Sequence, residues 1–192
     1  MYWITLLGYI APILIAISFV FYFQGIRRGT TKPHPLSWLI WGLLNAIAFA
    51  AQIAGGAGIG AIATGAIALS CTTIGLYSLK KQNVSLSLFD WISFLGGISA
   101  LIGWQITNNP LTAVLLVTLA DIFGFLPTLR KGFYKPYDDM AITFALDSFA
   151  LLLGIIAIET KTFTTLLYPI AIVLLDTSFV VVLLSQRNKY RA

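Results

Sequence analysis

Charged residues are scarce in this 192-residue chain: only 10% of the residues are Asp, Glu, Lys or Arg, and 58% are hydrophobic. A soluble domain carries about 25% charged residues, so the composition excludes a soluble enzyme, a soluble nucleic-acid-binding protein and a disordered tail. The single cysteine, Cys71, cannot form an intrachain disulfide. The mean hydropathy of +0.89 instead indicates an integral membrane protein.

Seven apolar runs follow one another along the chain with short connections between them. A membrane-spanning helix needs roughly 20 mainly apolar residues. The expected spans are residues 3–25, 36–55, 59–79, 88–107, 110–129, 141–158 and 162–185. We therefore predict an all-α integral membrane protein with seven transmembrane helices and no soluble domain.

The basic residues are distributed unevenly between the connections. Eleven of the twelve lysines and arginines follow the first, third, fifth or seventh span, and only Lys161 falls on the other side. Cytoplasmic connections carry an excess of basic residues, so we predict that the N-terminus lies outside and the C-terminus in the cytoplasm. Trp3 and Trp104 are then expected near the outer interface and Trp38 near the inner one, as parts of an aromatic belt.

Two of the basic connections share a motif. Residues 26–33 read IRRGTTKP and residues 129–136 read LRKGFYKP, which match at six of eight positions at an offset of 103 residues. The match predicts two three-helix repeats, residues 1–82 and 110–192, joined by an inverting fourth helix within residues 83–109. Because an odd helix separates them, both repeats have the same orientation. Parallel repeats of this kind are typical of transporters whose site lies near the membrane midplane.

Three of the seven acidic residues lie inside apolar runs: Asp121, Asp147 and Asp176. An ionised aspartate at the bilayer centre costs roughly 2.5–3.5 kcal/mol on insertion scales, so it is expected to face the bundle interior or a water-filled cavity. No lysine or arginine lies within an expected span, and desolvation with mutual repulsion favours proton binding. The alternative is that protonated aspartates only bond neighbouring helices.

The 103-residue offset pairs these acids with neutral positions in the first repeat. The pairs are Asp121 with Ser18, Asp176 with Thr73, and Asp147 with Leu44, which precedes Asn45. We therefore expect a cavity that is acidic on one wall and lined by hydroxyl or amide groups on the other. Such a cavity suits a polar or zwitterionic solute accompanied by a proton.

The segment 125–131 (FLPTLRK), the N-out topology and the division into three, one and three helices resemble the PQ-loop superfamily. This superfamily includes SWEET sugar transporters and cystinosin-like transporters. The second repeat has Pro127 followed by threonine, and the first has Gln24 at the position of Pro127, so neither contains a Pro-Gln dipeptide. The resemblance implies that Pro127 hinges an inner gate. It also implies that Asp147 carries a coupled proton and that Asp176 belongs to the corresponding seventh-helix segment.

These observations favour a secondary transporter of a small polar, amino-acid-like metabolite, coupled to protons and working by alternating access. The alternatives are an uncoupled sugar facilitator of the SWEET type and a seven-helix receptor or ligand sensor. No metal-ligand cluster or activated nucleophile is present in the sequence, so we expect no enzyme, catalytic residue, metal or cofactor.

The expected partners are a small polar solute, protons and the lipid bilayer, with no nucleic acid. Two complete repeats would let one chain form the pathway as a monomer, although a homodimer is also compatible with the sequence. The expected location is a plasma membrane or a bacterial inner membrane, with the chain as a multi-pass protein.

Overall fold

The computed structural model describes residues 2–80 and 88–189, and this part of the chain folds into seven α-helices and one short 3-10 helix. The helices are α1 (Tyr2–Arg28), α2 (Pro35–Ala54), α3 (Ile62–Leu79), α4 (Leu88–Thr107), α5 (Pro110–Tyr134), α6 (Ala141–Ala157) and α7 (Phe163–Lys189). The 3-10 helix η1 (Gly58–Ala61) directly precedes α3. The predicted all-helical fold is therefore confirmed.

Each predicted span coincides with one helix, and the differences lie at the helix ends. α5 continues five residues beyond the predicted end, to Tyr134, and α7 continues four residues, to Lys189. Basic residues lie in the last turns of both helices, where positive charge interacts favourably with the helix dipole. Because α5 is longer, Pro127 lies about two turns inside its end rather than one. The predicted boundary between residues 82 and 83 lies outside the described residues, as do Lys81 and Arg191.

Proline and asparagine define the beginnings of two helices. Pro35 and Pro110 occupy the first turns of α2 and α5, where a backbone N–H would have no intrahelical partner and its loss costs little. The side chain of Asn109 accepts a hydrogen bond from the backbone N–H of Leu111 at 3.0 Å. This bond satisfies one of the free donors at the start of α5.

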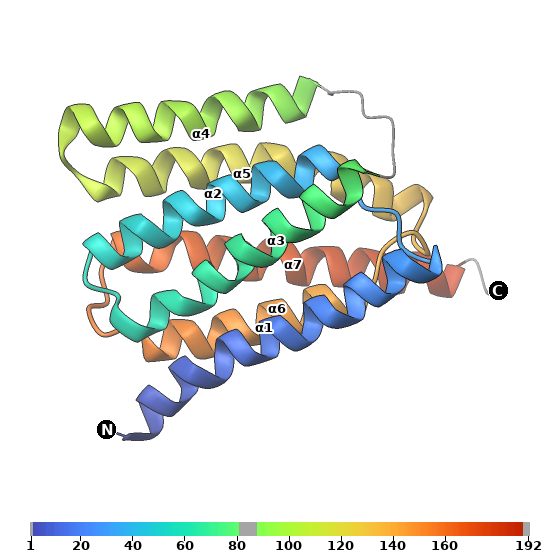
Figure 1. Cartoon of the computed structure of the whole chain (residues 1–192), viewed down its shortest axis with the longest axis horizontal. Coiled ribbons are helices and arrows are strands. Elements are labelled where there is room, and N and C mark those ends of the chain that lie inside the picture. The colour runs from blue at the N-terminus through green and yellow to red at the C-terminus, as the bar shows by residue number, and fades with distance from the viewer. Residues whose placement is uncertain (1, 81–87, 190–192) are drawn as a thin grey trace.

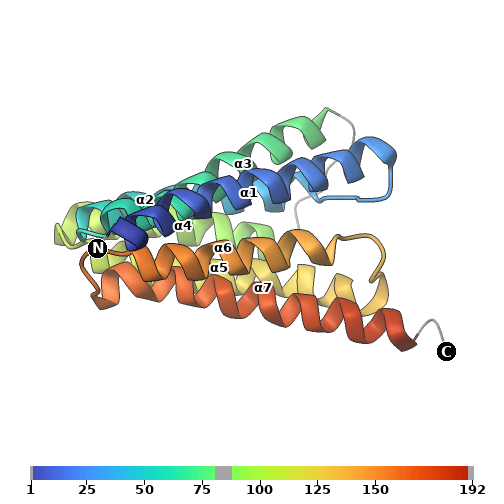
Figure 2. The ribbon, with the colours of Figure 1, turned by 90° about the horizontal axis from the view of Figure 1, so that it is seen from below.

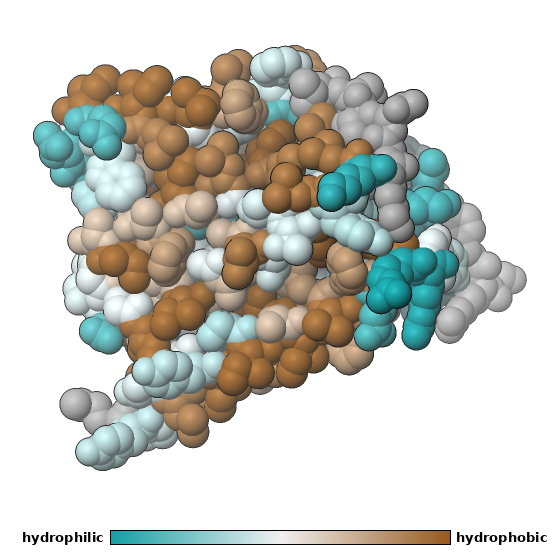
Figure 3. Space-filling model, viewed as in Figure 1, coloured by the Kyte–Doolittle hydropathy of each residue, from teal (hydrophilic) through white to brown (hydrophobic). Residues whose placement is uncertain are grey.

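Five helices are long and apolar enough to cross a membrane: α1, α2, α3 together with η1, α5 and α7. α6 is shorter and apolar, and α4 forms at the predicted bounds. Large hydrophobic side chains are exposed along the outside, and Leu69, Ile106 and Leu174 are each more than 60% exposed. Figure 3 shows an apolar flank with hydrophilic residues gathered at the ends. These features are consistent with an all-α membrane protein.

The helices form two layers (Figures 1 and 2). One layer contains α1, α2 and α3, with α3 packed against both α1 and α2; the other contains α5, α6 and α7, with α7 packed against both α5 and α6. The layers meet where α1 packs on α6 and α2 packs on α5. α4 lies at one edge of the bundle against α5 and α2.

The two ends of the bundle differ in charge. Connections α1–α2 and α5–α6 lie at the end near the C-terminus, which we call the basic end because Arg28, Lys32, Arg130 and Lys135 lie there. Connections α2–α3, α4–α5 and α6–α7 lie at the opposite end with the N-terminus. Lys161 is in the α6–α7 connection, so the distribution predicted from the sequence is preserved among the described residues.

Candidate functional site

A small cavity lies between the two helix layers. Its volume is about 40 Å³, which is room for a few water molecules, since one water needs roughly 10–15 Å³ by this measure. The cavity is lined by Phe19, Trp38, Trp41, Asn45, Ile67, Cys71, Asp121, Phe125, Phe144, Asp147, Ile172 and Asp176. Four of these, the three aspartates and Asn45, are candidate site residues from the sequence, and the fold brings them together.

The three carboxyl groups reach this cavity from three different helices. Asp121 on α5, Asp147 on α6 and Asp176 on α7 are only 2%, 6% and 6% exposed. None of the described residues that line the cavity is basic. A buried negative charge without a positive partner is costly, so this cluster is suited to binding a proton or another cation.

Each carboxyl group has a different hydrogen-bond environment. The hydroxyl of Tyr168 donates to Oδ2 of Asp121 at 2.6 Å, and the hydroxyl of Ser18 donates to Oδ1 of Asp147. Within residues 2–80 and 88–189, Asp176 makes no side-chain hydrogen bond, although it interacts electrostatically with the other two carboxyls. Ser18 on α1 therefore bonds a carboxyl group of the acidic cluster across the contact between the two layers.

Asn45 places an unpaired acceptor at the cavity. Its Nδ2 donates to the backbone carbonyl of Trp41 at 3.0 Å. Because a carbonyl can only accept, this bond determines the orientation of the amide. Oδ1 of Asn45 is buried and has no hydrogen-bond partner. A residue of the cavity wall thus carries one buried acceptor that is unpaired.

The structure does not bring Thr73, Gln24 or Pro127 to the cavity. Thr73 lies on the exposed face of α3, with its hydroxyl bonded to the carbonyl of Leu69 at 2.8 Å. Cys71 faces the cavity instead, because residues two positions apart point to nearly opposite sides of a helix. The expected hydroxyl counterpart of Asp176 is therefore absent from the cavity wall.

The two positions expected to form a hinge or gate lie toward the basic end. Gln24 is exposed on α1, in the turn before its basic last residues. Pro127 is half-buried inside α5 and lines a separate surface cavity with Arg130 and Lys131. Its place in α5 removes one backbone hydrogen bond from the helix, which is a local property and not evidence of motion.

Aromatic residues form a layer between the carboxyl groups and the basic end. Phe125, Phe144 and Phe179 each lie three or four positions from an aspartate of the same helix, on the side toward the basic end. Trp41 has the same relation to Asn45. The ring centroids of Trp41 and Phe125 are 5.8 Å apart, and those of Phe144 and Phe179 are 4.7 Å apart. This spacing on one helix face is visible in the sequence, and sequence reasoning missed it.

The interpretation of Trp38 as part of an aromatic belt is wrong. Its side chain is only 4% exposed, and it lines the cavity. Its ring packs against Trp41 at 5.5 Å and against Tyr22 at 4.6 Å. The position near a helix end suggested an interfacial residue, but the face of α2 that carries Trp38 is turned toward the other layer.

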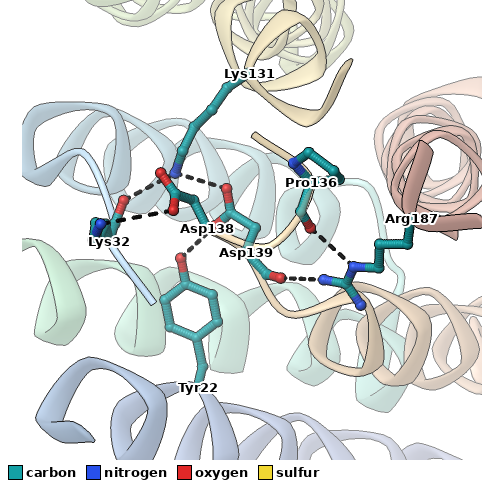
Figure 4. A network of polar contacts seen from close by, with 7 residues as sticks. All are labelled: Tyr22, Lys32, Lys131, Pro136, Asp138, Asp139 and Arg187. Carbon is teal, nitrogen blue, oxygen red and sulfur yellow. Dashed lines mark hydrogen bonds and ion pairs between the residues drawn. The ribbon is translucent and has the colours of Figure 1, made fainter. Parts of the chain in front are cut away.

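A polar network closes the basic end (Figure 4). Tyr22 donates to Oδ1 of Asp139 at 2.9 Å, and Lys131 lies 2.8 Å from Oδ2 of the same carboxyl. Lys131 also donates to the backbone carbonyl of Lys32 at 2.9 Å, and the side chain of Lys32 lies 3.8 Å from Asp138. The two connections that carry the repeated motif are thus bonded to each other.

α7 joins this network through Arg187. Its Nε donates to the carbonyl of Pro136 at 2.9 Å and its Nη2 to the carbonyl of Asp139 at 2.6 Å. Burial raises the pKa of the Asp139 carboxyl above its usual range, and the charge of Lys131 offsets part of that rise. From the sequence, Lys131 and Arg187 were interpreted through their positive charge as signals of membrane orientation. Their hydrogen-bond partners could not be predicted, because the tertiary fold brings them together.

Backbone contacts join the two layers at the opposite end. The N–H of Glu159 donates to the carbonyl of Ala57 at 3.1 Å, and the N–H of Thr160 donates to the carbonyl of Gly56 at 3.1 Å. Nearby, Nε2 of Gln52 on α2 donates to the carbonyl of Thr165 on α7 at 3.3 Å. The cavity therefore lies between two sets of contacts, one toward each end.

No family model, curated protein or solved structure matches the chain. The cavity itself offers three carboxyl groups, one unpaired amide oxygen and an aromatic wall. In the part of the chain that the structure describes, no group of three or more His, Cys, Asp or Glu residues is placed to hold a metal ion. The chemistry available to the cavity is binding of a proton or a cationic group.

Proposed function

We propose that the protein is a secondary transporter of a small polar, amino-acid-like solute, coupled to protons and working by alternating access. The observation that carries this proposal is the cluster of Asp121, Asp147 and Asp176 on one cavity between the two layers. Acidic residues held inside a membrane bundle without basic partners are a feature of proton relays and ion pathways.

The helix packing supports an arrangement as two parallel repeats. In two parallel repeats, α1 is equivalent to α5, α2 to α6 and α3 to α7. The contact between α1 and α6 then has its equivalent in the contact between α5 and α2, and both contacts are present. In the same way, the packing of α3 on α1 and α2 has its equivalent in that of α7 on α5 and α6. This pattern agrees with three helices, one inverting helix and three helices, as the PQ-loop resemblance implies.

We further propose that the basic end faces the cytoplasm. The described lysines and arginines lie there, apart from Lys161, and basic residues are enriched in cytoplasmic connections. The network of Lys131 and Asp139 then closes the cytoplasmic side, and the backbone contacts of Glu159 close the outer side. The cavity of about 40 Å³ lies between these two sets of contacts, where the central site of an alternating-access cycle is expected.

Proton movement in proteoliposomes tests this function. Purified protein is reconstituted with a pH-sensitive dye inside the vesicles, and amino acids, sugars and organic cations are added outside one at a time. We expect one solute class to be taken up and to move protons at the same time. Asp147→Asn removes an ionisable carboxyl from the cavity, so it should reduce proton movement more than tenfold.

The control is Ser178→Ala. It removes a polar group from an exposed residue of α7 that bonds its own helix and does not line the cavity, and it should transport like the wild type. Solute uptake by the wild type without proton movement would favour an uncoupled facilitator. Binding measured by thermal shift without any uptake would favour a receptor and would contradict the proposed transport.

A further inference from the structure

The charged groups of the cavity wall are all acceptors, and its donors are the Asn45 amide, the Cys71 thiol and the indole N–H groups of Trp38 and Trp41. The carboxyl groups of Asp121, Asp147 and Asp176 accept hydrogen bonds when ionised, and Oδ1 of Asn45 can only accept. Nδ2, the donor group of Asn45, is already bonded to Trp41. A ligand that matches this cavity must therefore bring N–H or O–H donors.

Two of these acceptors have no donor at present. Oδ1 of Asn45 is buried without a partner, and Asn45 is only 3% exposed. Asp176 is 6% exposed, lines the cavity and makes no hydrogen bond with the described residues. Leaving a buried polar group unpaired costs about 1–3 kcal/mol. This cost would be recovered when a ligand donates to both groups, so the observation points to a ligand and not only to a cluster of acids.

Aromatic rings form the rest of the cavity wall and favour an organic cation. Trp38, Trp41, Phe19, Phe125 and Phe144 line it, and tryptophan has the aromatic face that attracts cations most strongly. Among the described residues no group of three or more His, Cys, Asp or Glu is placed to hold a metal ion, whereas a nitrogen cation gains from carboxylates and aromatic rings together. The combination therefore favours an ammonium or guanidinium group over Na⁺.

We infer that the cavity binds the positively charged nitrogen group of the solute, an ammonium or guanidinium, in place of one proton on the carboxyl cluster of Asp121, Asp147 and Asp176. This inference rests on the proposed function and narrows its substrate class to nitrogen cations that carry N–H donors. The cation and the proton compete because each neutralises the same buried negative charge. Binding the cation releases the proton to water, so the charge of the cavity is unchanged.

Few other groups near the cavity take part in this competition. Cys71 on α3 is the further titratable side chain on the cavity wall, and Tyr168 on α7 contacts Asp121. The cavity residues of α1 and α2 are aromatic or amide groups, and the hydroxyl of Ser18 on α1 contacts Asp147. The small volume suits a group of a few non-hydrogen atoms, so the charged end of a larger solute is the part that enters.

Guanidinium at millimolar concentration is a suitable probe because it stays charged at every working pH and carries several N–H donors. Binding to the purified full chain is followed by tryptophan fluorescence, to which Trp38 and Trp41 on the cavity wall contribute, and proton release is followed by a pH dye in weak buffer. We expect one proton released per guanidinium bound. The apparent affinity should rise about tenfold for each pH unit over the range in which the displaced proton is bound.

Two comparisons test the recognition elements. Tetramethylammonium has the charge without N–H donors, and Na⁺ has the charge without organic character, so both should bind at least tenfold more weakly than guanidinium. Asn45→Leu removes the free acceptor and should lower guanidinium affinity about tenfold. Thr73→Val changes a polar side chain on α3 that faces away from the cavity, so it should leave the affinity unchanged.

The outcomes separate this inference from the proposed function. If folded wild-type protein binds no guanidinium between pH 5 and pH 9, or binds Na⁺ equally well, the nitrogen-cation inference is wrong. Proton-coupled uptake of a neutral or zwitterionic solute would in that case still uphold the transport proposal. If guanidinium binds with proton release but no solute is taken up by proteoliposomes, the binding inference holds and the transport proposal fails.

Discussion

At the scale of single residues, helix face decides whether a polar side chain is buried among helices or exposed outside. Asp121, Asp147 and Asp176 lie on inward faces, whereas Thr73 lies outward and bonds its own helix. The sequence identified the three acids because ionisable groups are rare in apolar runs. It could not identify Tyr168 as the partner of Asp121, because that contact joins α5 and α7.

The bond from Tyr168 to Asp121 predicts a stability effect. Tyr168→Phe removes the donor and leaves a buried acceptor unpaired, so the free energy of unfolding should fall by about 1–3 kcal/mol. Tyr9→Phe makes the same change at an exposed tyrosine on α1 and should have no effect. Thermal unfolding of both variants in the same detergent measures the difference, and equal stability of the two would contradict the structural role of this bond.

At the scale of elements, the connections between helices determine whether the ends of the bundle are closed. The network at the basic end links the α1–α2 connection, the α5–α6 connection and α7 through Lys131, Asp139 and Arg187. The repeated motif indicated that the two connections are equivalent. Their direct contact was not predictable, because it depends on how the two layers are placed against each other.

The raised pKa of Asp139 predicts that acid favours the closed basic end. Burial raises this pKa in the network, whereas an opened, hydrated end would return it toward about 3.9. The closed state therefore binds a proton on Asp139 more strongly than the open state does. Lowering the pH from the raised pKa of Asp139 toward its ordinary value therefore favours the closed state. Spin labels can be attached to cysteines that replace the exposed Arg28 and Lys189. The distribution of distances between the two labels should contain fewer long distances at acidic pH.

Two further variants complete this experiment. Asp139→Asn removes the titrating group, so the distance distribution should lose its dependence on pH. Asp138→Asn makes the same change at the neighbouring residue, which is partly exposed and pairs with Lys32, and should keep that dependence. A pH response that survives Asp139→Asn would assign the effect to another group.

At the scale of the whole molecule, the surface is apolar along the helices and the buried interior contains polar groups. Exposed leucine and isoleucine side chains cover the flanks, while Gln52, Asn45 and three aspartates are buried. This distribution is favourable in lipid and unfavourable in water. It links the composition of the chain to the two-layer bundle that holds the cavity.

The distribution of basic residues predicts the orientation of the bundle. With Cys71→Ser as background, a membrane-impermeant maleimide should label Lys161→Cys from outside intact cells but not Lys189→Cys. Cys71 is the single native cysteine, so its replacement leaves the introduced cysteine as the one thiol for the label. After the cells are made permeable, Lys189→Cys should also react. The reverse pattern would place the basic end outside and contradict the proposed orientation.

The helical class, the approximate bounds of the seven helices in the described residues and the acids of the candidate site were predictable from the sequence. These properties depend on local hydropathy and on rare residue types, which can be seen along one chain segment. The packing of the helices was needed to show that Trp38 faces the cavity, that Thr73 does not, and that Lys131 bonds Asp139. These outcomes depend on the rotation of each helix about its axis and on the placement of the layers, because almost every face of an apolar helix is hydrophobic enough for either lipid or protein.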